Sequence, residues 1–429
     1  MIDSILAHIN TSPTPYHGVQ TMVSVLSAAG FEPLDETKTW QLRAGGRYYV
    51  VRNLTSLMAF RVPKEGLGGV PQLKLAGAHT DSPTLKVKPT PLKEKNRLLV
   101  WDVEIYGSPI LSTWFDRDLS LAGLVVYRNG KGQIGHQLID FKKPITRLPN
   151  LAIHLNREVN KGYAPDRHTE LNPIFGPINP DLSAREQFTK RIKQALADEG
   201  VGKTDTLELL DWDLSFYDTQ PVQFSGLANE WVVGARLDNL LSCFVGLESL
   251  IGPSNEENLS LLACFDHEEV GSTSTVGANG NFMESLLHRL VPHEERFRQT
   301  LATAKMISVD NAHGYHPNFP NKQDENNSPY LGEGVVLKYN TNQRYATHAL
   351  SGSWFINLCQ QKQIPSQHFT VRADMGCGST IGPMLSARLG LSALDIGVPT
   401  WAMHSIRETA ASQDITHLQT LWNHFYNMP

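Results

Sequence analysis

Several apolar segments of this sequence are followed at once by acidic or imidazole side chains. The segments are short and rich in Leu, Val and Ala, a pattern that is typical of buried β-strands. Because the carboxyl ends of parallel strands meet at one edge of an α/β sheet, we expect these polar side chains to converge in space. They are His79, Asp81, Glu268, Glu269, Asp310 and His404, and Asp238 joins them at the start of a helical segment.

The combination of imidazoles and carboxylates without thiolates predicts a site for divalent metal ions. Such ligands suit zinc, manganese or cobalt, and one bridging carboxylate can hold two ions about 3.5–4 Å apart. Three ligand carboxylates, Asp238, Glu269 and Asp310, would leave two dications with a small positive surplus, which favours an activated water and a polarised carbonyl. In the pair Glu268–Glu269, one carboxylate can bind a metal while its neighbour takes a proton from the attacking water. These residues indicate a metallohydrolase.

Each residue, taken alone, also has an ordinary structural interpretation. An aspartate at the start of a helix, such as Asp238, commonly caps that helix. Polar residues after strands are usually turn formers. A glutamate pair such as Glu268–Glu269 is usually solvated, and a histidine among apolar residues, such as His404, is usually a hydrogen-bonded core residue. Only the joint placement of these residues favours the metal site.

The elements that must position these residues differ along the chain. Residues 1–30 have the periodicity of an amphipathic helix that is interrupted at Pro13 and Pro15. Residues 47–62 and 73–79 are rich in Val, Tyr and Leu and are bounded by Gly and Pro, which predicts strands. His79, the first of the candidate residues in the chain, is therefore preceded by a helical segment and then by predicted strands.

A different pattern occupies residues 91–230, where short strand-like runs and prolines surround one helical segment. From residue 231 onward, helical and strand-like segments alternate, which is typical of an α/β fold. We therefore predict an α/β domain formed by 1–90 and 231–429, with an inserted β-rich domain at 91–230. Helices are expected at 185–200, 240–252, 284–291, 351–361 and 417–427, and strands at 258–266, 305–310, 335–340 and 391–399.

Composition excludes several other classes of protein. The 429 residues include 38 Lys and Arg against 43 Asp and Glu, so the net charge of −5 argues against a nucleic-acid binder. No apolar run approaches the roughly 18–20 residues that a membrane-spanning helix needs, and the first residues lack the features of a signal peptide. The four cysteines form no CxxC pair, which excludes a zinc ribbon and indicates packing thiols of a reducing compartment. We expect a cytoplasmic protein without membrane or nucleic-acid partners.

Eight strings in this order make the sequence recognisable: GAHTDSP, STWFDRDLSLAG, GARLDNL, DHEEVGS, VDNAHGYHPN, NQRYAT, GSTIGP and AMHSIRE. They span essentially the whole chain, which resembles the aspartyl aminopeptidases of the M18 metallopeptidase family. The resemblance implies a catalytic α/β domain with a central mixed, zinc-peptidase-like sheet and an inserted β-rich dimerisation domain. It further implies two divalent ions per subunit, most often zinc, peptide substrates with a free N-terminal Asp or Glu, and a tetrahedral homo-dodecamer.

The resemblance also assigns roles to individual residues. Glu268 matches the general base, and Asp81 matches the carboxylate that orients a ligand histidine. Asp238 matches the ligand that bridges both metals. The remaining ligands are His79 and Asp310 for one metal, and Glu269 and His404 for the other.

Three further residues bear on substrate binding. Lys338 matches a family lysine that pairs with the acidic side chain of the substrate, although an exposed lysine at a strand end is the ordinary alternative. Tyr345 is expected in the same pocket, and His154 resembles a histidine that a neighbouring subunit contributes to the active site. The sequence departs from eukaryotic relatives at His267, where Asn is expected, and around Cys377.

Two other functions stay open at this point. The same chemistry could serve neutral or basic N-terminal residues, since the acidic preference depends on few positions. A catalytically inactive scaffold stabilised by metal is the second alternative. Structural zinc sites are usually closed and rich in thiolates, whereas this set is rich in oxygen and keeps Glu268 where a base belongs.

Overall fold

The described residues fall into two compact units. This computed structural model describes residues 1–253 and 255–428. The first unit comprises residues 1–82, 222–403 and 408–429, and the second comprises 83–221 and 404–407. The main segment of the second unit, 83–221, begins and ends earlier in the chain than the predicted insertion at 91–230, and residues 404–407 join it from the C-terminal part of the chain. Its start is earlier because strand β5 (Thr84–Lys95) pairs with β6 and β10 of the second unit.

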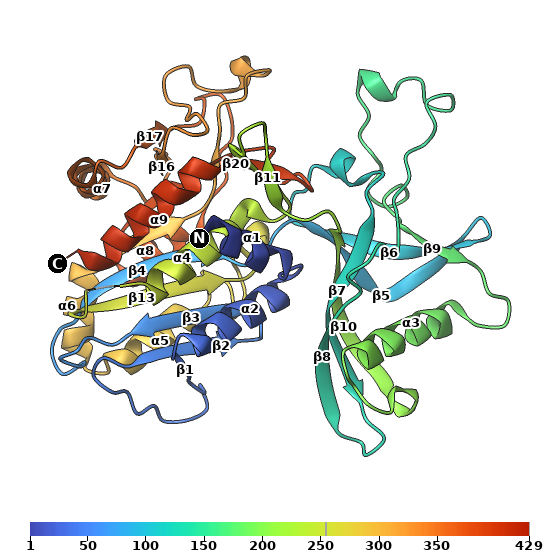
Figure 1. Ribbon diagram of the computed structural model, residues 1–429, viewed down its shortest axis with the longest axis horizontal. Helices are drawn as coiled ribbons and strands as arrows, with labels where there is room; N and C mark the ends of the chain where they lie inside the picture. The colour runs from blue at the N-terminus through green and yellow to red at the C-terminus, as the bar shows by residue number, and fades with distance from the viewer. Residues whose placement is uncertain (254, 429) are drawn as a thin grey trace. The chain divides into compact units, whose positions relative to one another are not determined.

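Nine strands in the described part of the chain form the main sheet of the first unit, in the order β1-β2-β3-β13-β4-β14-β18-β16-β17 (Figure 1). At the centre of this sheet, the neighbouring pairs β13–β4, β4–β14 and β14–β18 are parallel. The flanking pairs β3–β13 and β16–β18 are antiparallel. The strands are β1 (Glu32–Pro33), β2 (Arg47–Arg52), β3 (Ser56–Arg61), β4 (Gln72–His79), β13 (Asn258–Phe265), β14 (Lys305–Val309), β16 (Val335–Lys338), β17 (Ser366–Phe369) and β18 (Ser392–Gly397).

Alternate residues of these strands enter two separate hydrophobic cores, one on each face of the sheet. In β3, Leu57 and Ala59 belong to one core, whereas Met58 and Phe60 belong to the other. Successive side chains of a strand point to opposite faces, so both faces of this sheet are covered by helices. This explains why the strands read as continuous apolar runs rather than as alternating patterns.

Five helices cover one face, and three cover the other, among the described residues. The first group, α1, α2, α4, α7 and α9, shares the core that contains Leu57, and the second group, α5, α6 and α8, shares the core that contains Met58. Pro15 begins α2, where its missing N–H group costs no helical hydrogen bond. The helices are α1 (Ile2–Asn10), α2 (Pro15–Ala28), α4 (Ser242–Ile251), α5 (Phe282–Leu290), α6 (Glu294–Thr303), α7 (Ala349–Lys362), α8 (Ile381–Leu389) and α9 (Ser412–Asn427).

A smaller sheet also belongs to the first unit. Its five described strands have the order β11-β12-β20-β19-β15. Strand β20 leads directly into α9, and β15 follows β14 of the main sheet after two residues. The strands are β11 (Gln223–Ser225), β12 (Trp231–Gly234), β15 (Ala312–His313), β19 (Pro399–Trp401) and β20 (Glu408–Ala411).

The second unit is an antiparallel sheet with one long helix, α3 (Ala184–Asp198), packed on it. Its six strands in the described chain have the order β8-β7-β10-β5-β6-β9. Phe188 and Ile192 of α3 enter the same core as Trp101 and Phe216 of the sheet. Besides β5, the strands are β6 (Leu98–Tyr106), β7 (Leu119–Arg128), β8 (Ile134–Asp140), β9 (Ile174–Pro177) and β10 (Glu208–Asp218).

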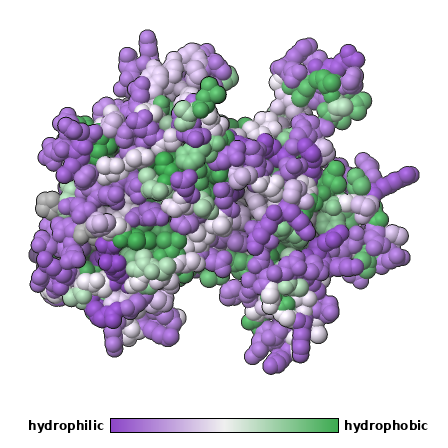
Figure 2. Space-filling model, viewed as in Figure 1, coloured by the Kyte–Doolittle hydropathy of each residue, from purple (hydrophilic) through white to green (hydrophobic). Residues whose placement is uncertain are grey.

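A long loop of the second unit, between β8 and β9, exposes apolar side chains. Leu151 is 60% exposed, Ile153 46% and Leu155 75%. In Figure 2, hydrophobic residues gather at the end of the loop at the upper right of the view. A short 3-10 turn, η2 (Val159–Lys161), follows these residues.

Among the described residues, no helix has both the length and the apolar character that crossing a membrane requires.

Candidate metal centre

Three parallel strands of the main sheet end at the same edge. β4 lies between β13 and β14, and His79 at the end of β4 is paired with Phe265 at the end of β13. The chain after β13 forms a short turn, η5 (Glu268–Val270), and the chain after β14 begins with Asp310. The edge therefore brings His79, both glutamates of the turn and Asp310 into one region of the first unit.

Asp81 holds the imidazole of His79 in one orientation. The Nδ1 atom of His79 lies 3.0 Å from the carbonyl oxygen of Asp81 and 3.3 Å from its Oδ1 atom. Both side chains are buried. A proton on Nδ1 that is directed at Asp81 leaves Nε2 with the lone pair that a metal ion takes.

The Nε2 atom of His79 faces carboxylates from two other segments. It lies 3.3 Å from Oδ1 of Asp238 and 3.6 Å from Oδ1 of Asp310. Burial alone would lower the pKa of His79, but the hydrogen-bonding carboxylates of Asp238, Asp310 and Asp81 raise it well above its ordinary value. The imidazole is therefore surrounded by negative charge.

Asp238 occupies an irregular turn, η4 (Leu237–Leu241), in which its own backbone is not helical and its peptide bond to Asn239 is cis. Its N–H group donates to Oε2 of the buried Glu408 at 2.9 Å. The N-cap of the following helix α4 is Leu241, so Asp238 is not the helix cap that its sequence position would also allow. The turn instead directs the Asp238 carboxylate at His79.

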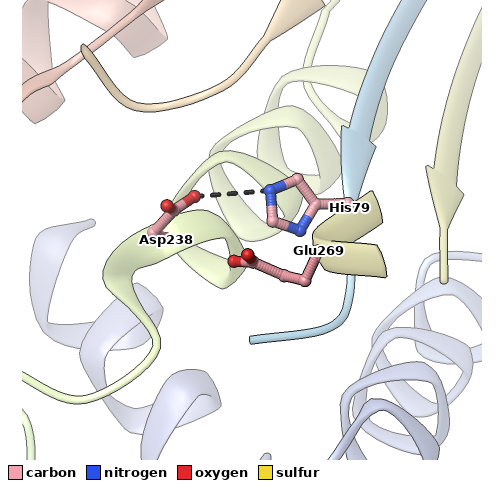
Figure 3. A group of neighbouring side chains, drawn as sticks. All are labelled: His79, Asp238 and Glu269. Carbon is pink, nitrogen blue, oxygen red and sulfur yellow. Dashed lines mark ion pairs between the residues drawn. The ribbon is translucent and has the colours of Figure 1, made fainter. Parts of the chain in front are cut away.

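Glu269 completes a compact set of potential ligands with His79 and Asp238. One ligand atom from each of these residues lies within 4.8 Å of the others. Figure 3 shows the three side chains pointing toward one another, with the pair between Asp238 and His79 marked. The three come from β4, from the turn before α4 and from the turn after β13.

The glutamate pair is half-buried and is therefore not a solvated acidic corner. The carboxylate of Asp81 accepts hydrogen bonds from the N–H groups of Glu268, at 3.2 Å, and Glu269, at 3.1 Å. Burial raises the pKa of Glu268 to about 8, and the negative charges of Asp310 and neighbouring aspartates act in the same direction. His267, which precedes the pair, has a left-handed backbone with φ of 64°.

These donors fit divalent cations. The ligand atoms are one imidazole nitrogen and several carboxylate oxygens, which is the chemistry of zinc, manganese or cobalt sites. Four buried or half-buried acids around a single imidazole also concentrate negative charge that bound dications would offset. The acids are Asp238, Glu268, Glu269 and Asp310.

Comparison with known proteins identifies the family. A family model described as "Aminopeptidase I zinc metalloprotease (M18)" matches residues 8–426. The chain belongs to the M18 metallo-aminopeptidase family. This confirms the resemblance that the eight sequence strings indicated and makes the chain a hydrolase of the aminopeptidase class.

Relatives of this M18 chain match it over most of their length. It is 47% identical to "Probable M18 family aminopeptidase 2" of Ectopseudomonas mendocina, with 100% of this chain and 98% of the relative covered. Among solved structures, the "Ape4 and Nbr1 complex" is 33% identical with a TM-score of 0.94, covering 99% of this chain and 84% of that chain. The S. cerevisiae "mApe1 dodecamer" is 25% identical with a TM-score of 0.82, covering 99% and 97%. The predicted mixed α/β fold class is confirmed.

Lys338 of this M18 chain is buried and is not the exposed strand-end lysine that the sequence also allowed. Its exposed fraction is 1%, and its Nζ atom donates to the carbonyl oxygen of Asn311 at 3.0 Å. The same Nζ lies 3.5 Å from Oδ2 of Asp310 and 5.1 Å from the centre of the Tyr345 ring. The cation, the aromatic ring and a candidate metal ligand are therefore neighbours.

A cavity of about 270 Å³ is lined in part by residues that belong to the same hydrophobic cluster as Tyr345. Phe369 and Cys377 belong both to the cavity lining and to the cluster that contains Tyr345. Two cationic side chains, Lys322 and Arg372, also line this cavity. The cavity is therefore adjacent to the cluster that contains Tyr345, although Tyr345 and Lys338 do not line it.

Two predicted site residues lie in the second unit. Within it, the Nδ1 atom of the half-buried His404 lies 3.1 Å from the carbonyl oxygen of Ser108. His404 also has a left-handed backbone, with φ of 66°. His154 is exposed, between the apolar Ile153 and Leu155 of the long loop.

Among the buried acids of the first unit, the sequence interpretation missed Glu408 and Asp395, which adjoin the candidate residues Asp238 and Lys338. Glu408 accepts from the N–H group of Asp238. Asp395 is fully buried in β18, where it lies opposite Lys338 of the neighbouring strand β16. An acid inside an apolar strand is costly to bury, so the Asp395 in LSALDIGV was itself a signal that could have been used.

Proposed function

We propose that this chain removes N-terminal residues from peptides, preferentially Asp and Glu, with two divalent ions, most often zinc, at the candidate centre. The observation that carries the proposal is the gathering of His79, Asp238 and Glu269 around one point, with Glu268 beside them. In this proposal His79 and Asp310 would hold one ion, Glu269 and His404 would hold the other, and Asp238 would be a ligand to both. Cobalt and manganese suit the same donors.

Bound dications would polarise the first peptide carbonyl and lower the pKa of the attacking water. Glu268 then acts as the general base, because its carboxylate lies among the ligand acids without being assigned to an ion. It takes the proton from the water and returns it to the nitrogen of the leaving amine. Asp81 keeps Nδ1 of His79 protonated, so that Nε2 stays available as a ligand.

Lys338 and Tyr345 supply the acidic preference in this proposal. A buried ammonium group binds a carboxylate strongly, because water does not screen the pair. The ring of Tyr345, 5.1 Å from Nζ, limits the space around the cation. An acidic side chain would add a carboxylate contact to an ammonium group that already lies 3.5 Å from Oδ2 of Asp310. A neutral side chain in the same place would make no such contact, and this difference produces selectivity.

We also propose that the second unit mediates dimerisation and that the subunits form a tetrahedral dodecamer. The exposed Leu151, Ile153 and Leu155 support this, since apolar side chains grouped on one loop are typical of contact surfaces. The S. cerevisiae relative with known structure is a dodecamer. His154 on the same loop would then reach the active site of a neighbouring subunit.

We further propose a reducing compartment, the cytoplasm. All four cysteines lie in the described chain as free thiols, and three of them are buried. Buried free cysteines behave as small apolar side chains and need no oxidising environment.

Initial hydrolysis rates on matched Asp, Glu, Leu and Lys aminoacyl substrates test this function. The purified protein is supplemented with Zn²⁺, Co²⁺ or Mn²⁺, and a chelator serves as the control. Chelator-sensitive cleavage that favours Asp and Glu is expected. A preference for Leu or Lys would replace the acidic specificity with a neutral or basic one, and no cleavage of any substrate would favour an inactive, metal-stabilised scaffold.

A further inference from the structure

Asp395 is a buried acid to which the proposed function assigns no role. It lies in β18, its side chain is fully buried, and its exposed fraction is 0%. Burial raises its pKa, whereas the charge of Lys338 and hydrogen bonds lower it. A carboxyl group in such surroundings is retained only where its contacts offset the cost of burying it.

Each oxygen of Asp395 accepts a hydrogen bond from a different segment. Oδ2 accepts from the N–H group of Ala346 at 2.6 Å, and Oδ1 accepts from the hydroxyl group of Thr380 at 2.6 Å. The N–H group of Asp395 donates to Oγ1 of Thr347 at 2.9 Å. One residue of β18 therefore fixes the segment 345–347 on two sides and also fixes the start of α8.

The start of α8 is fitted closely around this carboxylate. Thr380 is the N-cap of α8, yet its hydroxyl group is directed at Asp395 and makes no cap hydrogen bond within the helix. A Cβ atom on Gly382 would lie only 2.5 Å from Oδ2 and 2.8 Å from Oδ1 of Asp395. The negative charge also lies at the helix end that favours an anion.

The segment that Asp395 fixes carries Tyr345. Ala346 is the next residue, so its hydrogen bond to Asp395 restricts the backbone position of Tyr345. The Tyr345 ring lies 5.1 Å from Nζ of Lys338. Lys338 is itself the direct partner of Asp395 in the antiparallel pair β16–β18, so their side chains share one face of the sheet.

We propose that Asp395 is a positioning residue for recognition of the substrate's N-terminal side chain. It holds segment 345–347 so that the Tyr345 ring lies against the Lys338 ammonium group, and it does so without contacting the substrate. This inference rests on the proposed function, in which Lys338 and Tyr345 bind that side chain. It assigns to β18 a part in specificity that is separate from the metal ligands.

The test compares Asp395→Ala with Asp395→Asn. Alanine removes both acceptors, whereas asparagine can accept from Ala346 through its oxygen and donate to the Thr380 hydroxyl through its amide. We expect Asp395→Ala to raise KM for aspartyl substrates by about tenfold or more and to leave kcat for leucyl substrates within about threefold. Asp395→Asn should restore KM to within about threefold of the wild-type value. Bound metal, measured on the same samples, should stay unchanged.

A second pair of variants covers the case in which Asp395→Ala does not fold. Thr347→Val removes only the acceptor for the Asp395 N–H group, and Thr347→Ser keeps it. The valine variant should raise KM for aspartyl substrates by about threefold, and the serine variant should behave as wild type. Equal effects on aspartyl and leucyl substrates, or no rescue by asparagine and serine, would overturn the positioning role.

Lys338→Met, measured alongside, separates this inference from the function on which it rests. If the wild-type protein shows no acidic preference, or if Lys338→Met leaves the ratio of Asp to Leu rates unchanged, the proposed acidic pocket itself fails. If Lys338→Met abolishes the preference and the Asp395 and Thr347 variants keep it, only the role of Asp395 is refuted.

Discussion

Asp81 shows how much of the candidate centre depends on one carboxylate. It orients His79 through Nδ1 and also accepts from the N–H groups of Glu268 and Glu269. The turn after β13 is thereby attached to the loop after β4. The sequence allowed a prediction of these residues as a group, because they lie at or after strand ends, and the family resemblance implied that Asp81 orients a ligand histidine. It carried no signal for the hydrogen bonds from the N–H groups of Glu268 and Glu269 to Asp81.

Glu268→Gln is expected to lower kcat by about 10²–10⁴-fold, the contribution typical of a general base. Glutamine keeps the size of the side chain and loses the ability to accept a proton. Steady-state kinetics on an aspartyl substrate measures the effect, and bound metal should equal that of the wild-type protein.

Glu269→Gln is the matched control for Glu268→Gln, because the two residues are adjacent in the same turn. It should lower the bound metal as well as the rate, since an amide is a weaker ligand than a carboxylate. Full activity of Glu268→Gln would remove the assigned role of the base.

At the level of the elements, apolar periodicity predicted where most helices and strands of the first unit lie. Strands expected at 258–266 and 305–310 are β13 and β14, and the helix expected at 417–427 is the second part of α9. The order of strands in the sheet could not be predicted in this way, because pairing depends on contacts between distant segments. Helices α6 and α8 were not predicted; in α6, few of the residues are buried, so its apolar signal is weak.

The contact between the end of β18 and Asp310, the residue that follows β14, makes a prediction at this scale. A Cβ atom on Gly397, the last residue of β18, would lie 1.8 Å from the carbonyl oxygen of Asp310. Gly397→Ala therefore must displace the backbone that carries Asp310. We expect a loss of about 1–3 kcal/mol in the free energy of unfolding, which is typical of overpacking, and a lower content of bound metal.

Urea denaturation in the presence of a chelator measures the stability of Gly397→Ala apart from metal binding. Gly69→Ala is the control, since a Cβ atom there would have no neighbour within 4 Å. Equal stability and equal metal content of the two variants would show that β18 does not constrain Asp310.

For the whole molecule, the proposed dodecamer connects assembly with activity. Leu155→Asp places a charge on a side chain that is 75% exposed in the long loop, and it should reduce the mass measured by light scattering. Activity should fall with the mass, while bound metal stays constant.

His154→Ala should lower activity without changing the mass, because it removes only the imidazole. A wild-type mass of one or two subunits would contradict the proposed assembly.

The order of strands in the main sheet also bears on synthesis of the chain. β3 and β4 are consecutive in the sequence, yet β13 lies between them in the sheet and pairs with both. At the usual rates of translation, β13 leaves the ribosome roughly 10–40 s after β4. During this interval the facing edges of β3 and β4 have no partner, and unpaired strand edges promote aggregation. We therefore expect the nascent chain to need protection by a chaperone until β13 has been made.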